Sequence, residues 1–229
     1  MRVVVTGGAG FIGTNLVIRL LKEGHEPVVV DDFSSGLHSN VTHLDVEVIK
    51  GDIRDLDQLA GTVQGSDAVV HLAARGSVPR SIAFPLETHL TNATGTLNVL
   101  EAARKTGAKV IFSSSSSVYG ENQELPKNEL MRTEPITPYA ASKLAGESYA
   151  RAYAENYGLS VTTFRFFNVF GPWQRPDHAY AAVVPRWIWH ALHGKAIRVF
   201  GDGSTTRDFT FVDDVVEVLL RTLTTDANH

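Results

Sequence analysis

Short apolar runs alternate along the chain with longer segments in which apolar residues recur every three or four positions. The short runs are rich in Val, Ile and Phe and are flanked by glycine or polar residues, which is typical of strands buried on both faces of a parallel sheet. They cover residues 3–6, 27–32, 46–51, 68–73, 109–114 and 161–166. The segments of helical period cover residues 11–23, 56–63, 86–106 and 139–157.

Glycine follows three of these predicted helices, at Gly24, Gly107 and Gly158, as expected of a glycine that ends a helix. Strands that alternate with helices, joined by right-handed crossovers, build a doubly wound parallel sheet. The pattern therefore predicts an α/β fold of the Rossmann type, with its first domain over residues 1–165.

The pattern changes after residue 165. Residues 171–182 are rich in proline, aromatic and charged side chains and predict a loop. A helix at 183–193, strands at 197–201 and 206–212 and a helix at 214–222 are predicted to follow. Trp187 and Trp189 in the first of these helices are more typical of packing than of binding. Residues 166–229 are too few for a full second domain, so we expect a small, incomplete substrate-binding region there.

Composition narrows the classes of function. The chain has 229 residues, 43% of them hydrophobic, and its 21 basic and 25 acidic residues give a net charge of −4. Such a balance, without a basic stripe, argues against a nucleic-acid partner. No apolar run reaches the length of about 18 residues that a membrane span needs. The absence of cysteine excludes disulfides and thiolate metal sites, and the nine histidines show no metal-ligand spacing. We expect a cytoplasmic protein without a metal.

Gly7, Gly10 and Gly13 form a G-x-x-G-x-x-G pattern between the first strand and the first helix. Small residues there allow a tight turn, let a pyrophosphate approach the backbone and let the helix pack on the sheet. The amide groups and the positive end of the helix then meet the phosphates. A glycine run alone is a weak signal, but its place directly after a run of three valines predicts a dinucleotide-binding loop.

Asp31 ends the second strand, 18 residues after Gly13. This is near the spacing of an acid that accepts hydrogen bonds from the adenosine ribose. A carboxylate there would repel a 2′-phosphate, so the sequence favours NAD over NADP. Two alternatives stay open: Asp31 is a strand-end acid that only makes the turn soluble, or Asp32 shares or takes the role.

Tyr139 and Lys143 lie four positions apart at the start of a predicted helix and therefore on the same face. The pKa of tyrosine is about 10, so lowering it by about three units to reach neutral pH takes about 4 kcal/mol. The lysine cation, with the positive nicotinamide ring, would supply this stabilisation. A serine-rich strand end at 112–117 precedes the pair and would polarise the substrate oxygen. The arrangement predicts a general base, although such pairs also occur by chance.

Together these motifs resemble the extended short-chain dehydrogenase/reductase family. The resemblance rests on the glycine loop, Asp31, residues 51–53 and 71–74, residues 92–96, the run Ser113–Tyr119 and the run Tyr139–Lys143. Residues 165–172, 201–203 and 207–209 resemble the UDP-glucose 4-epimerase-like branch of that family. The resemblance covers nearly all of the chain, and the joint occurrence of the motifs is far more specific than any one of them.

The resemblance implies residue roles by matching position. Ser115 matches the catalytic serine or threonine, Tyr139 the general base and Lys143 the lysine that binds the nicotinamide ribose. Asp52 and Ile53 would hold the adenine. The implied NAD site comprises Gly7, Gly10, Phe11, Ile12, Gly13, Asp31, Asp32, Ser34, Ser35, Gly36, Asp52, Ile53, Leu72, Ala73, Ala74, Arg75, Asn92, Ser113, Tyr139, Lys143 and Phe166.

The same resemblance implies a UDP-sugar as substrate and a homodimer formed through the helices at 86–106 and 139–157. Asn168 and Arg207 match positions that bind the nucleotide and the pyrophosphate. Alternatives stay open, since Asn168 would also suit a loop cap and Arg207 would also pair with Asp208 or Asp213. The implied substrate site comprises Ser77, Ser115, Ser116, Ser117, Asn168, Val183, Arg186, Phe200, which would stack near the uracil, and Arg207.

The residues after Ser115 bear on the reaction. Dehydratases of the family place Asp-Glu there, and the decarboxylases tend to keep the glutamate, whereas this chain has Ser116 and Ser117. A hydroxyl group cannot replace a carboxylate as an acid–base near neutral pH. We therefore expect a UDP-sugar 4-epimerase acting on UDP-glucose/UDP-galactose or UDP-glucuronate/UDP-galacturonate. The alternatives are a dehydratase or decarboxylase, or a non-catalytic binding module, which would not need the intact catalytic residues.

Overall fold

The computed structural model describes residues 1–177, 181–199 and 201–225. Its centre is a parallel six-stranded sheet with the strand order β3-β2-β1-β4-β5-β6. The order reverses between β1 and β4, and sheets of this kind bind ligands at the carboxyl ends of the strands beside such a reversal. The strands are β1 (Arg2–Thr6), β2 (Glu26–Asp31), β3 (Glu47–Lys50), β4 (Ala68–His71), β5 (Lys109–Ser115) and β6 (Val161–Phe166).

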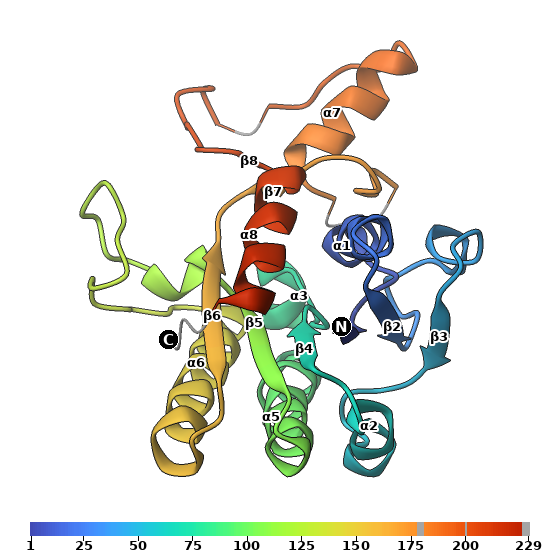
Figure 1. Ribbon diagram of the computed structural model, residues 1–229. Helices are drawn as coiled ribbons and strands as arrows, with labels where there is room; N and C mark the ends of the chain where they lie inside the picture. The colour runs from blue at the N-terminus through green and yellow to red at the C-terminus, as the bar shows by residue number, and fades with distance from the viewer. Residues whose placement is uncertain (178–180, 200, 226–229) are drawn as a thin grey trace.

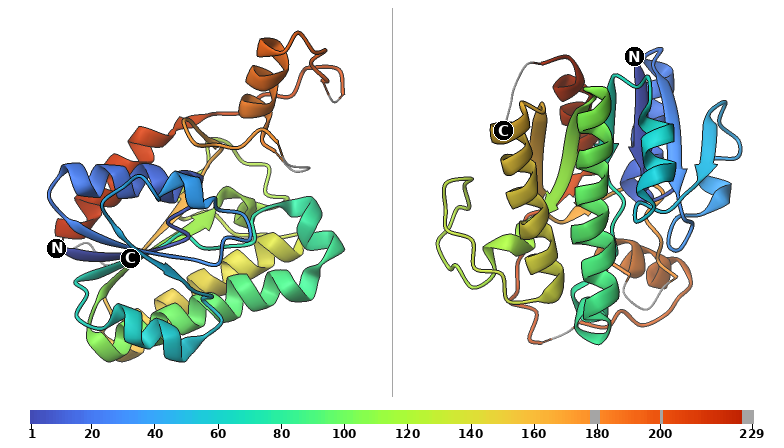
Figure 2. Two further views of the ribbon diagram at one scale, coloured as in Figure 1. Left: turned by 90° about the vertical axis from the view of Figure 1, so that its right-hand side faces the viewer. Right: turned by 90° about the horizontal axis from the view of Figure 1, so that it is seen from below.

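Helices cover both faces of this sheet (Figures 1 and 2). Two of them, α1 (Phe11–Lys22) and α8 (Val212–Thr224), lie together on one face. The other face is covered by α2 (Leu56–Val63), α5 (Gly95–Thr106) and α6 (Pro138–Tyr157). The predicted doubly wound α/β fold is confirmed. Gly107 and Gly158 end α5 and α6 in the left-handed conformation, as their positions predicted.

The core consists of two apolar layers, one on each face of the sheet. Successive side chains of a strand point to opposite faces, so Val3 and Val5 face α1 and α8 whereas Val4 faces α2 and α5. This burial on both faces explains why each of these strands is a continuous run of apolar residues in the sequence. Helix α8 lies after residue 165, yet Val216 and Leu219 belong to the first of these layers. The division of the chain at residues 165/166 stays a prediction.

One predicted helix is interrupted. The segment predicted as a single helix over 86–106 begins with α4 (Pro85–His89), continues as the π-helical turn η2 (Leu90–Thr94) and then becomes α5. A π-helical turn adds one residue to a helical turn, and such turns occur frequently at functional sites. Periodicity of apolar residues is too coarse to show it. A further short helix, α3 (Val78–Ala83), was not predicted.

The C-terminal region differs most from expectation. Helix α7 (Val183–Leu192) forms where predicted, but residues 197–199 are not a strand, and the strand predicted at 206–212 is only β8 (Thr210–Phe211). Strand β8 pairs with β7 (Val169–Phe170). A strand needs a partner, and the described part of residues 197–209 pairs with none. None of the described helices is long and apolar enough to cross a membrane.

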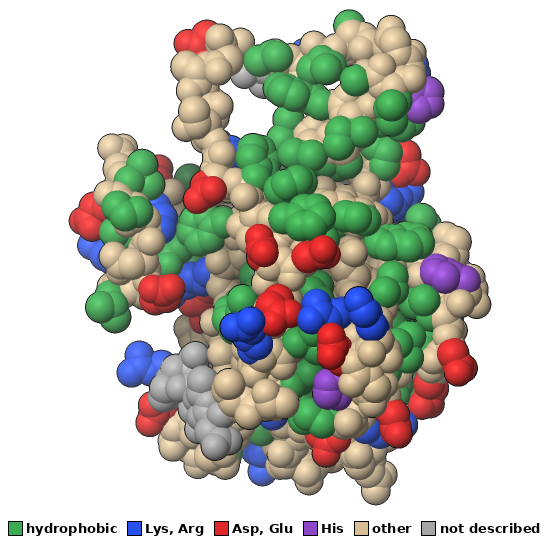
Figure 3. All heavy atoms as spheres, turned by 45° about the horizontal axis from the view of Figure 1, so that its top comes forward, with side chains coloured by type: hydrophobic (Ala, Val, Ile, Leu, Met, Phe, Trp, Pro, Cys, Tyr) green, Lys and Arg blue, Asp and Glu red, His purple; other side chains and the backbone are tan. Residues whose placement is uncertain are grey.

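Helix α7 projects beyond the carboxyl ends of the central strands (Figure 1), and none of its residues is buried. Apolar side chains gather at this end of the molecule (Figure 3). The exposed apolar residues on and around α7 are Trp173, Trp187, Ile188, Leu192, Phe209 and Phe211. The helix thus stands apart from both core layers and contributes its side chains to surfaces and cavities instead.

Candidate active site

The glycine loop brings the ends of three strands into contact. Gly7 follows β1 with a φ of +71°, and its amide donates to the carbonyl oxygen of Val30 in β2 at 2.7 Å. A Cβ atom on Gly7 would lie 2.7 Å from the backbone nitrogen of Ala73, just after β4. A Cβ atom on Gly13 would lie 2.2 Å from the carbonyl oxygen of Gly7. The loop therefore presents backbone amides without side chains at the start of α1, which fits a dinucleotide pyrophosphate.

Asp31 holds the next loop against the glycine loop. Its carboxylate is buried and accepts hydrogen bonds from the amides of Ala9 (3.0 Å) and Phe33 (2.9 Å), and burial raises its pKa. A Cβ atom on Gly36 would lie 2.9 Å from this carboxylate. Asp32 is exposed and accepts from the amide and hydroxyl of Ser34 (2.9 and 2.6 Å). Asp31 and Gly36 thus lie at the glycine loop, whereas Asp32 organises its own turn.

Asp52 and Ile53 follow β3 at the same edge of the sheet. The Asp52 carboxylate forms a two-pronged ion pair with Arg54, which lowers the pKa of Asp52. Ile53 is buried, and a Cβ atom on Gly95 of α5 would lie 2.5 Å from its Cδ1 atom. The backbone carbonyl of Ile53 accepts a hydrogen bond from the Asn98 side chain at 3.1 Å. These contacts hold the proposed adenine end of the site in place.

The π-helical turn η2 carries Asn92, which links β4 to helix α6. Its side-chain oxygen accepts from the amide of Arg75 at 2.8 Å, and its side-chain nitrogen donates to the hydroxyl of Ser142 at 3.0 Å. Asn92 is buried. The wide turn therefore places Asn92 between the residues after β4 and the helix that carries Tyr139. Ser142 was not predicted, and no sequence signal marks the π-helical turn.

His71 lies beneath the site and was not predicted as a functional residue. Its ring nitrogens bond to the hydroxyls of Thr6 (2.7 Å) and Thr96 (3.0 Å), and burial lowers its pKa to about 3. The Thr96 hydroxyl donates in turn to the carbonyl of Asn92 at 2.5 Å. A neutral imidazole therefore ties β1, β4 and α5 to the π-helical turn.

Helix α6 begins close to the end of β5 and brings the predicted catalytic residues together. Thr137 caps the helix by accepting from the amide of Ala140 at 3.2 Å, and Pro138 occupies the first turn. Tyr139 lies near Ser115 at the end of β5, which lowers the pKa of Tyr139 against the larger effect of burial. Lys143 is buried, and its ammonium donates to the carbonyl of Ser113 at 2.8 Å. Ser115, Tyr139 and Lys143 thus lie near one another at the carboxyl end of β5.

The pKa of Tyr139 differs from expectation. We expected Lys143 to help lower it, but burial raises the pKa of Tyr139, opposed only by the nearby Ser115. Burial also lowers the pKa of Lys143, to about 8. The reason is that Lys143 is engaged with the carbonyl of Ser113, while both groups lie where ionisation is penalised. The residues of the chain alone therefore keep Tyr139 protonated at neutral pH.

Glu147 and Arg165 form a mostly buried ion pair beside these residues. The Arg165 guanidinium donates to Glu147 at 2.8 Å, with side-chain exposures of 20% and 12%. Glu147 also accepts from the Ser114 hydroxyl at 2.5 Å, and the Arg165 guanidinium lies 4.8 Å from the ring centre of Tyr119. The pair joins α6, β5 and β6, and sequence reasoning did not identify it.

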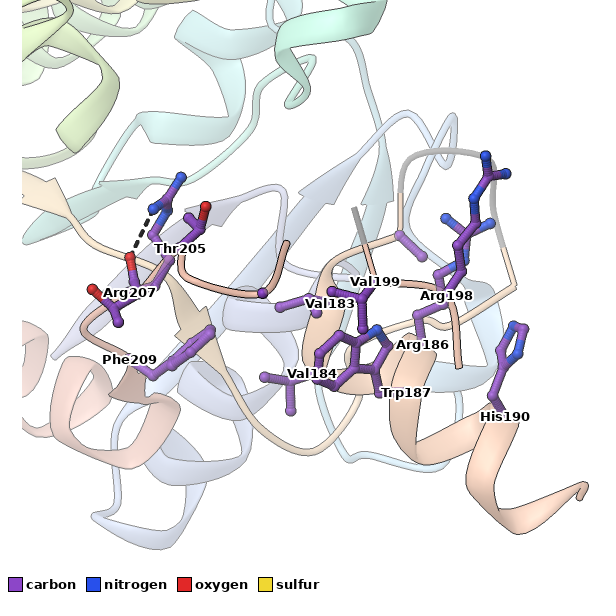
Figure 4. A pocket seen from close by; sticks show the side chains of 13 residues that line it. Val183, Val184, Arg186, Trp187, His190, Arg198, Val199, Thr205, Arg207 and Phe209 are labelled. Atoms are coloured by element: carbon purple, nitrogen blue, oxygen red, sulfur yellow. Dashed lines mark hydrogen bonds between the residues drawn. The ribbon is translucent and has the colours of Figure 1, made fainter. Parts of the chain in front are cut away.

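The remaining predicted substrate residues gather around helix α7. A cavity of about 770 Å³ is lined by Val183, Arg186 and Arg207, which the resemblance assigns to the substrate site (Figure 4). Trp187, Arg198 and Phe209 also line it. Trp187, which was expected to pack rather than to bind, lines this cavity and is 39% exposed, because α7 stands away from the core. Three guanidinium groups and no acidic side chain line the cavity among the described residues.

Two predicted substrate residues, Asn168 and Ser77, do not line this cavity. Asn168 has a φ of +39°, and its side chain donates to the carbonyl of Asp208 at 2.8 Å, which ties β7 to β8. Ser77 caps α3 with a φ of +127°, a strained conformation for a residue other than glycine. Phe200 lies outside the described residues. The Arg207 guanidinium donates to the carbonyl of Thr206 at 2.7 Å.

Comparison with known proteins identifies the family. The sequence model of the NAD dependent epimerase/dehydratase family matches residues 3–229. The chain belongs to this family. The UDP-glucose 4-epimerase of Mycolicibacterium smegmatis is 44% identical, over 96% of this chain and 72% of that protein. UDP-glucuronic acid decarboxylase 1 of Danio rerio is 38% identical, over 96% of this chain and 53% of that protein.

Solved structures of the family are also similar to this chain. A UDP-N-acetylglucosamine 4-epimerase from Methanobrevibacter ruminantium, in complex with UDP-N-acetylmuramic acid, superposes with a TM-score of 0.95 at 40% identity, over 99% of this chain and 74% of that one. A dTDP-glucose 4,6-dehydratase from Streptomyces venezuelae with NAD bound gives a TM-score of 0.91 at 35% identity, over 100% and 73%. The chain is thus an NAD-dependent enzyme. Since epimerases, dehydratases and decarboxylases are all similar to it, membership does not select the reaction.

Proposed function

We propose that this protein is an NAD-dependent UDP-sugar 4-epimerase. The observation that carries the proposal is that Ser115 and Tyr139 meet at a site where the next two positions, Ser116 and Ser117, bear hydroxyl groups. The carboxylate beside them, Glu147, is already paired with Arg165 and bonded to Ser114. No group of this cluster is therefore suited to removing a proton from C5 or to expelling a C6 hydroxyl.

The residues then act as follows. Hydride acceptance from C4 and its return to the other face is the chemistry that NAD supplies when bound. Tyr139 takes the proton of the C4 hydroxyl and later gives it back. Ser115 donates a hydrogen bond to the C4 oxygen, which becomes a carbonyl in the 4-keto sugar. Lys143, one helical turn from Tyr139, supplies positive charge near the proposed ribose position. The glycine loop holds the pyrophosphate of the dinucleotide.

The cavity at α7 supports a nucleoside diphosphate as the carrier of the sugar. Arg186, Arg198 and Arg207 supply the donors that suit a diphosphate, and no acidic residue of the described lining opposes them. Trp187 and Phe209 supply apolar surface for a base. UDP-glucose and UDP-glucuronate are the sugars we propose, and small hydroxyl side chains at 116 and 117 suit either one.

The test is an analysis of the sugar nucleotides that the natural protein forms. Incubation with NAD and UDP-glucose or UDP-glucuronate in deuterated water is expected to yield the C4 epimer, without net NADH and without deuterium at C5. Tyr139→Phe is the matched control and is expected to form no epimer while it still binds NAD. A 4-keto-6-deoxy sugar or a pentose as product would refute the proposal and favour a dehydratase or a decarboxylase. Binding without turnover would favour a binding module.

We also infer that the enzyme acts as a homodimer in the cytoplasm. Helices α4 and α6 expose apolar side chains, including Leu86 (67%) and Tyr149 (41%), on the segments that the resemblance assigns to the dimer interface. Light scattering of the natural protein is expected to give twice the mass of one chain. A monomer at micromolar concentration would contradict this inference.

A further inference from the structure

Buried polar side chains form a continuous series of hydrogen bonds from the end of β1 to helix α6. They come from β1, β4, the π-helical turn η2, α5 and α6, and each is at most 4% exposed. This series, called the buried network below, consists of Thr6, His71, Thr96, Asn92 and Ser142. It begins at the amide of Ala73, 3.4 Å from the Thr6 hydroxyl, and ends at the carbonyl of Tyr139, 2.8 Å from the Ser142 hydroxyl.

The direction of the first half of the buried network follows from donor counts. The carbonyl of Asn92 can only accept, so the Thr96 hydroxyl, 2.5 Å away, donates its single hydrogen there and must accept from His71. The hydrogen of the neutral imidazole is therefore on Nε2, and Nδ1 accepts from the Thr6 hydroxyl at 2.7 Å. Thr6 in turn accepts from the amide of Ala73.

The second half of the buried network runs in the same direction. The backbone amide of Arg75 can only donate, so the Asn92 atom that lies 2.8 Å from it is the oxygen, and the nitrogen faces Ser142. Ser142 donates its hydrogen to the carbonyl of Tyr139 and accepts from Asn92 at 3.0 Å. Each hydroxyl hydrogen of the buried network thus has an acceptor, and the series runs one way, from Ala73 to Tyr139.

Ser142 and Lys143 attach the start of α6 to two different elements. Neighbouring residues of a helix point about 100° apart. Ser142 is bonded to the π-helical turn, and Lys143 donates to the carbonyl of Ser113 in β5 at 2.8 Å. One attachment constrains the helix in one direction, whereas two attachments about 100° apart constrain both its rotation and its position. Tyr139 lies in the turn just before them, so its place depends on both.

We propose that Ser142 is a positioning residue, which through Asn92 keeps Tyr139 aligned with residues 73–75, the segment that the resemblance assigns to the cofactor. This proposal rests on the proposed function, in which Tyr139 is the base. Asn92 connects the two sides, because its oxygen binds the amide of Arg75 while its nitrogen binds Ser142. A base must lie within hydrogen-bond reach of the proton that it takes, and a displacement of about 1 Å can lower a rate about 100-fold.

Ser148 on the same helix separates this role from a purely helical one. The Ser148 hydroxyl is exposed and donates to the carbonyl of Leu144 at 3.0 Å, within α6. Ser142 makes the same kind of bond to its own helix but is buried and also accepts from the π-helical turn. Because alanine is a better helix former than serine, neither substitution by alanine weakens α6 through helix propensity. Ser148→Ala is therefore the matched control for Ser142→Ala.

The test compares kcat and NAD affinity in these two variants. Ser142→Ala is expected to lower kcat about 10- to 100-fold, because Tyr139 is displaced from its partner atoms. It is expected to weaken NAD binding in calorimetry about three- to tenfold, because Asn92 loses a hydrogen bond that holds it beside Arg75. Ser148→Ala should leave both values within about twofold of those of the natural protein.

A second pair of variants breaks the buried network at another point. Thr96→Val removes the hydroxyl and keeps the volume of the side chain, so kcat and NAD affinity should fall in the same direction as in Ser142→Ala. Thr96→Ser keeps the hydroxyl and should retain both values. If Ser142→Ala does not fold, this pair decides the question, and equal kcat and NAD affinity in Thr96→Val and Thr96→Ser would overturn the proposal.

Nitrogen NMR of protein labelled at its nine histidines tests the direction of the buried network without NAD or sugar. His71→Asn assigns the resonances of His71, and we expect the ring hydrogen on Nε2. A hydrogen on Nδ1 would overturn the proposal. So would a folded Ser142→Ala that matches Ser148→Ala in kcat and NAD affinity and differs from it in thermal stability alone. The NMR and calorimetric measurements use no sugar, so they remain valid even if the enzyme catalyses another reaction.

Discussion

Gly13→Ala tests whether the glycine loop is built around the absence of a side chain. Gly13 lies in the first turn of α1, and its Cβ atom would be 2.2 Å from the carbonyl oxygen of Gly7 and 2.7 Å from the Cα atom of Gly8. Real Cβ atoms essentially never come closer than 3.0 Å to another heavy atom, so either the helix at Gly13 or the Gly7 carbonyl must move by about 0.8 Å. Both neighbours are backbone atoms, and no rotamer change can relieve the contact.

The size of the effect follows from what that backbone is bonded to. The Gly7 carbonyl accepts from the amide of Gly10 at 3.1 Å, and the Gly7 amide donates to Val30 at 2.7 Å. Overpacking of this kind destabilises a protein by about 1–3 kcal/mol. The clash would also displace the amides that bind the phosphates of NAD. If the binding free energy falls by about 3 kcal/mol, NAD affinity falls about 100-fold, because each tenfold change in affinity corresponds to about 1.4 kcal/mol.

The assay combines calorimetric titration with NAD and unfolding in urea without NAD. Gly61→Ala is the matched control, because Gly61 lies within α2 and nothing lies within 4 Å of its Cβ position. The same substitution there should stabilise the protein by about 0.5–1 kcal/mol through helix propensity and leave NAD affinity unchanged. A Gly13→Ala variant that bound NAD within twofold of the natural protein would refute the steric reasoning.

Three further predictions concern catalysis, cofactor choice and pH. In steady-state assays, Tyr139→Phe should lower kcat by several orders of magnitude and Ser115→Ala should lower it by about 100-fold. Binding assays of Tyr139→Phe should show a nearly unchanged affinity for NAD, and substantial activity of this variant would point to another base. Asp31→Ala should narrow the preference for NAD over NADP in calorimetry, whereas equal affinity of the natural protein for both cofactors would contradict our reading of Asp31. The pKa of His71 falls from 6.5 to about 3 on folding. Its neutral form therefore stabilises the fold above pH 6.5, and this contribution is lost as the pH falls towards 3. In urea unfolding, the free energy of unfolding of the natural protein should fall by on the order of 3 kcal/mol between pH 6.5 and 4, and that of His71→Asn should not. An identical pH dependence in the two proteins would contradict a neutral, buried His71.

The central sheet was predictable because its signals are local. A parallel strand buried on both faces needs apolar residues at every position, so the valines of β1 and β2 mark the strands directly. Gly107 and Gly158 mark helix ends by their own backbone conformation. Once strands and helices alternate, the carboxyl ends of the parallel strands must share one edge. The glycine loop, Asp31 and Ser115 each lie at such a carboxyl end, of β1, β2 and β5.

Contacts between distant segments were not predictable in this way. His71 bonds to hydroxyls 65 and 25 residues away, and Glu147 of α6 pairs with a guanidinium 18 residues away on strand β6. The π-helical turn at Asn92 adds one residue to a turn of helix, and the spacing of apolar residues along the sequence does not reveal this extra residue. The direction of the pKa shift of Tyr139 depends on burial, and burial is a property of everything that packs around a side chain.

The sequence by itself determined the α/β class, the position of the dinucleotide loop and the identity of the residues that meet as Ser115, Tyr139 and Lys143. The fold class and the loop follow from hydrophobic period and glycine spacing, and Tyr139 and Lys143 follow from their place on one helix face. These signals act within a few residues, whereas Ser115 was identified through the resemblance to the family. Only the tertiary structure decided that Trp187 lines a cavity, that Lys143 is bonded to a backbone carbonyl and that Ser142 is bonded to Asn92. Side-chain environment depends on which segments fold together, and that information is spread over the whole chain.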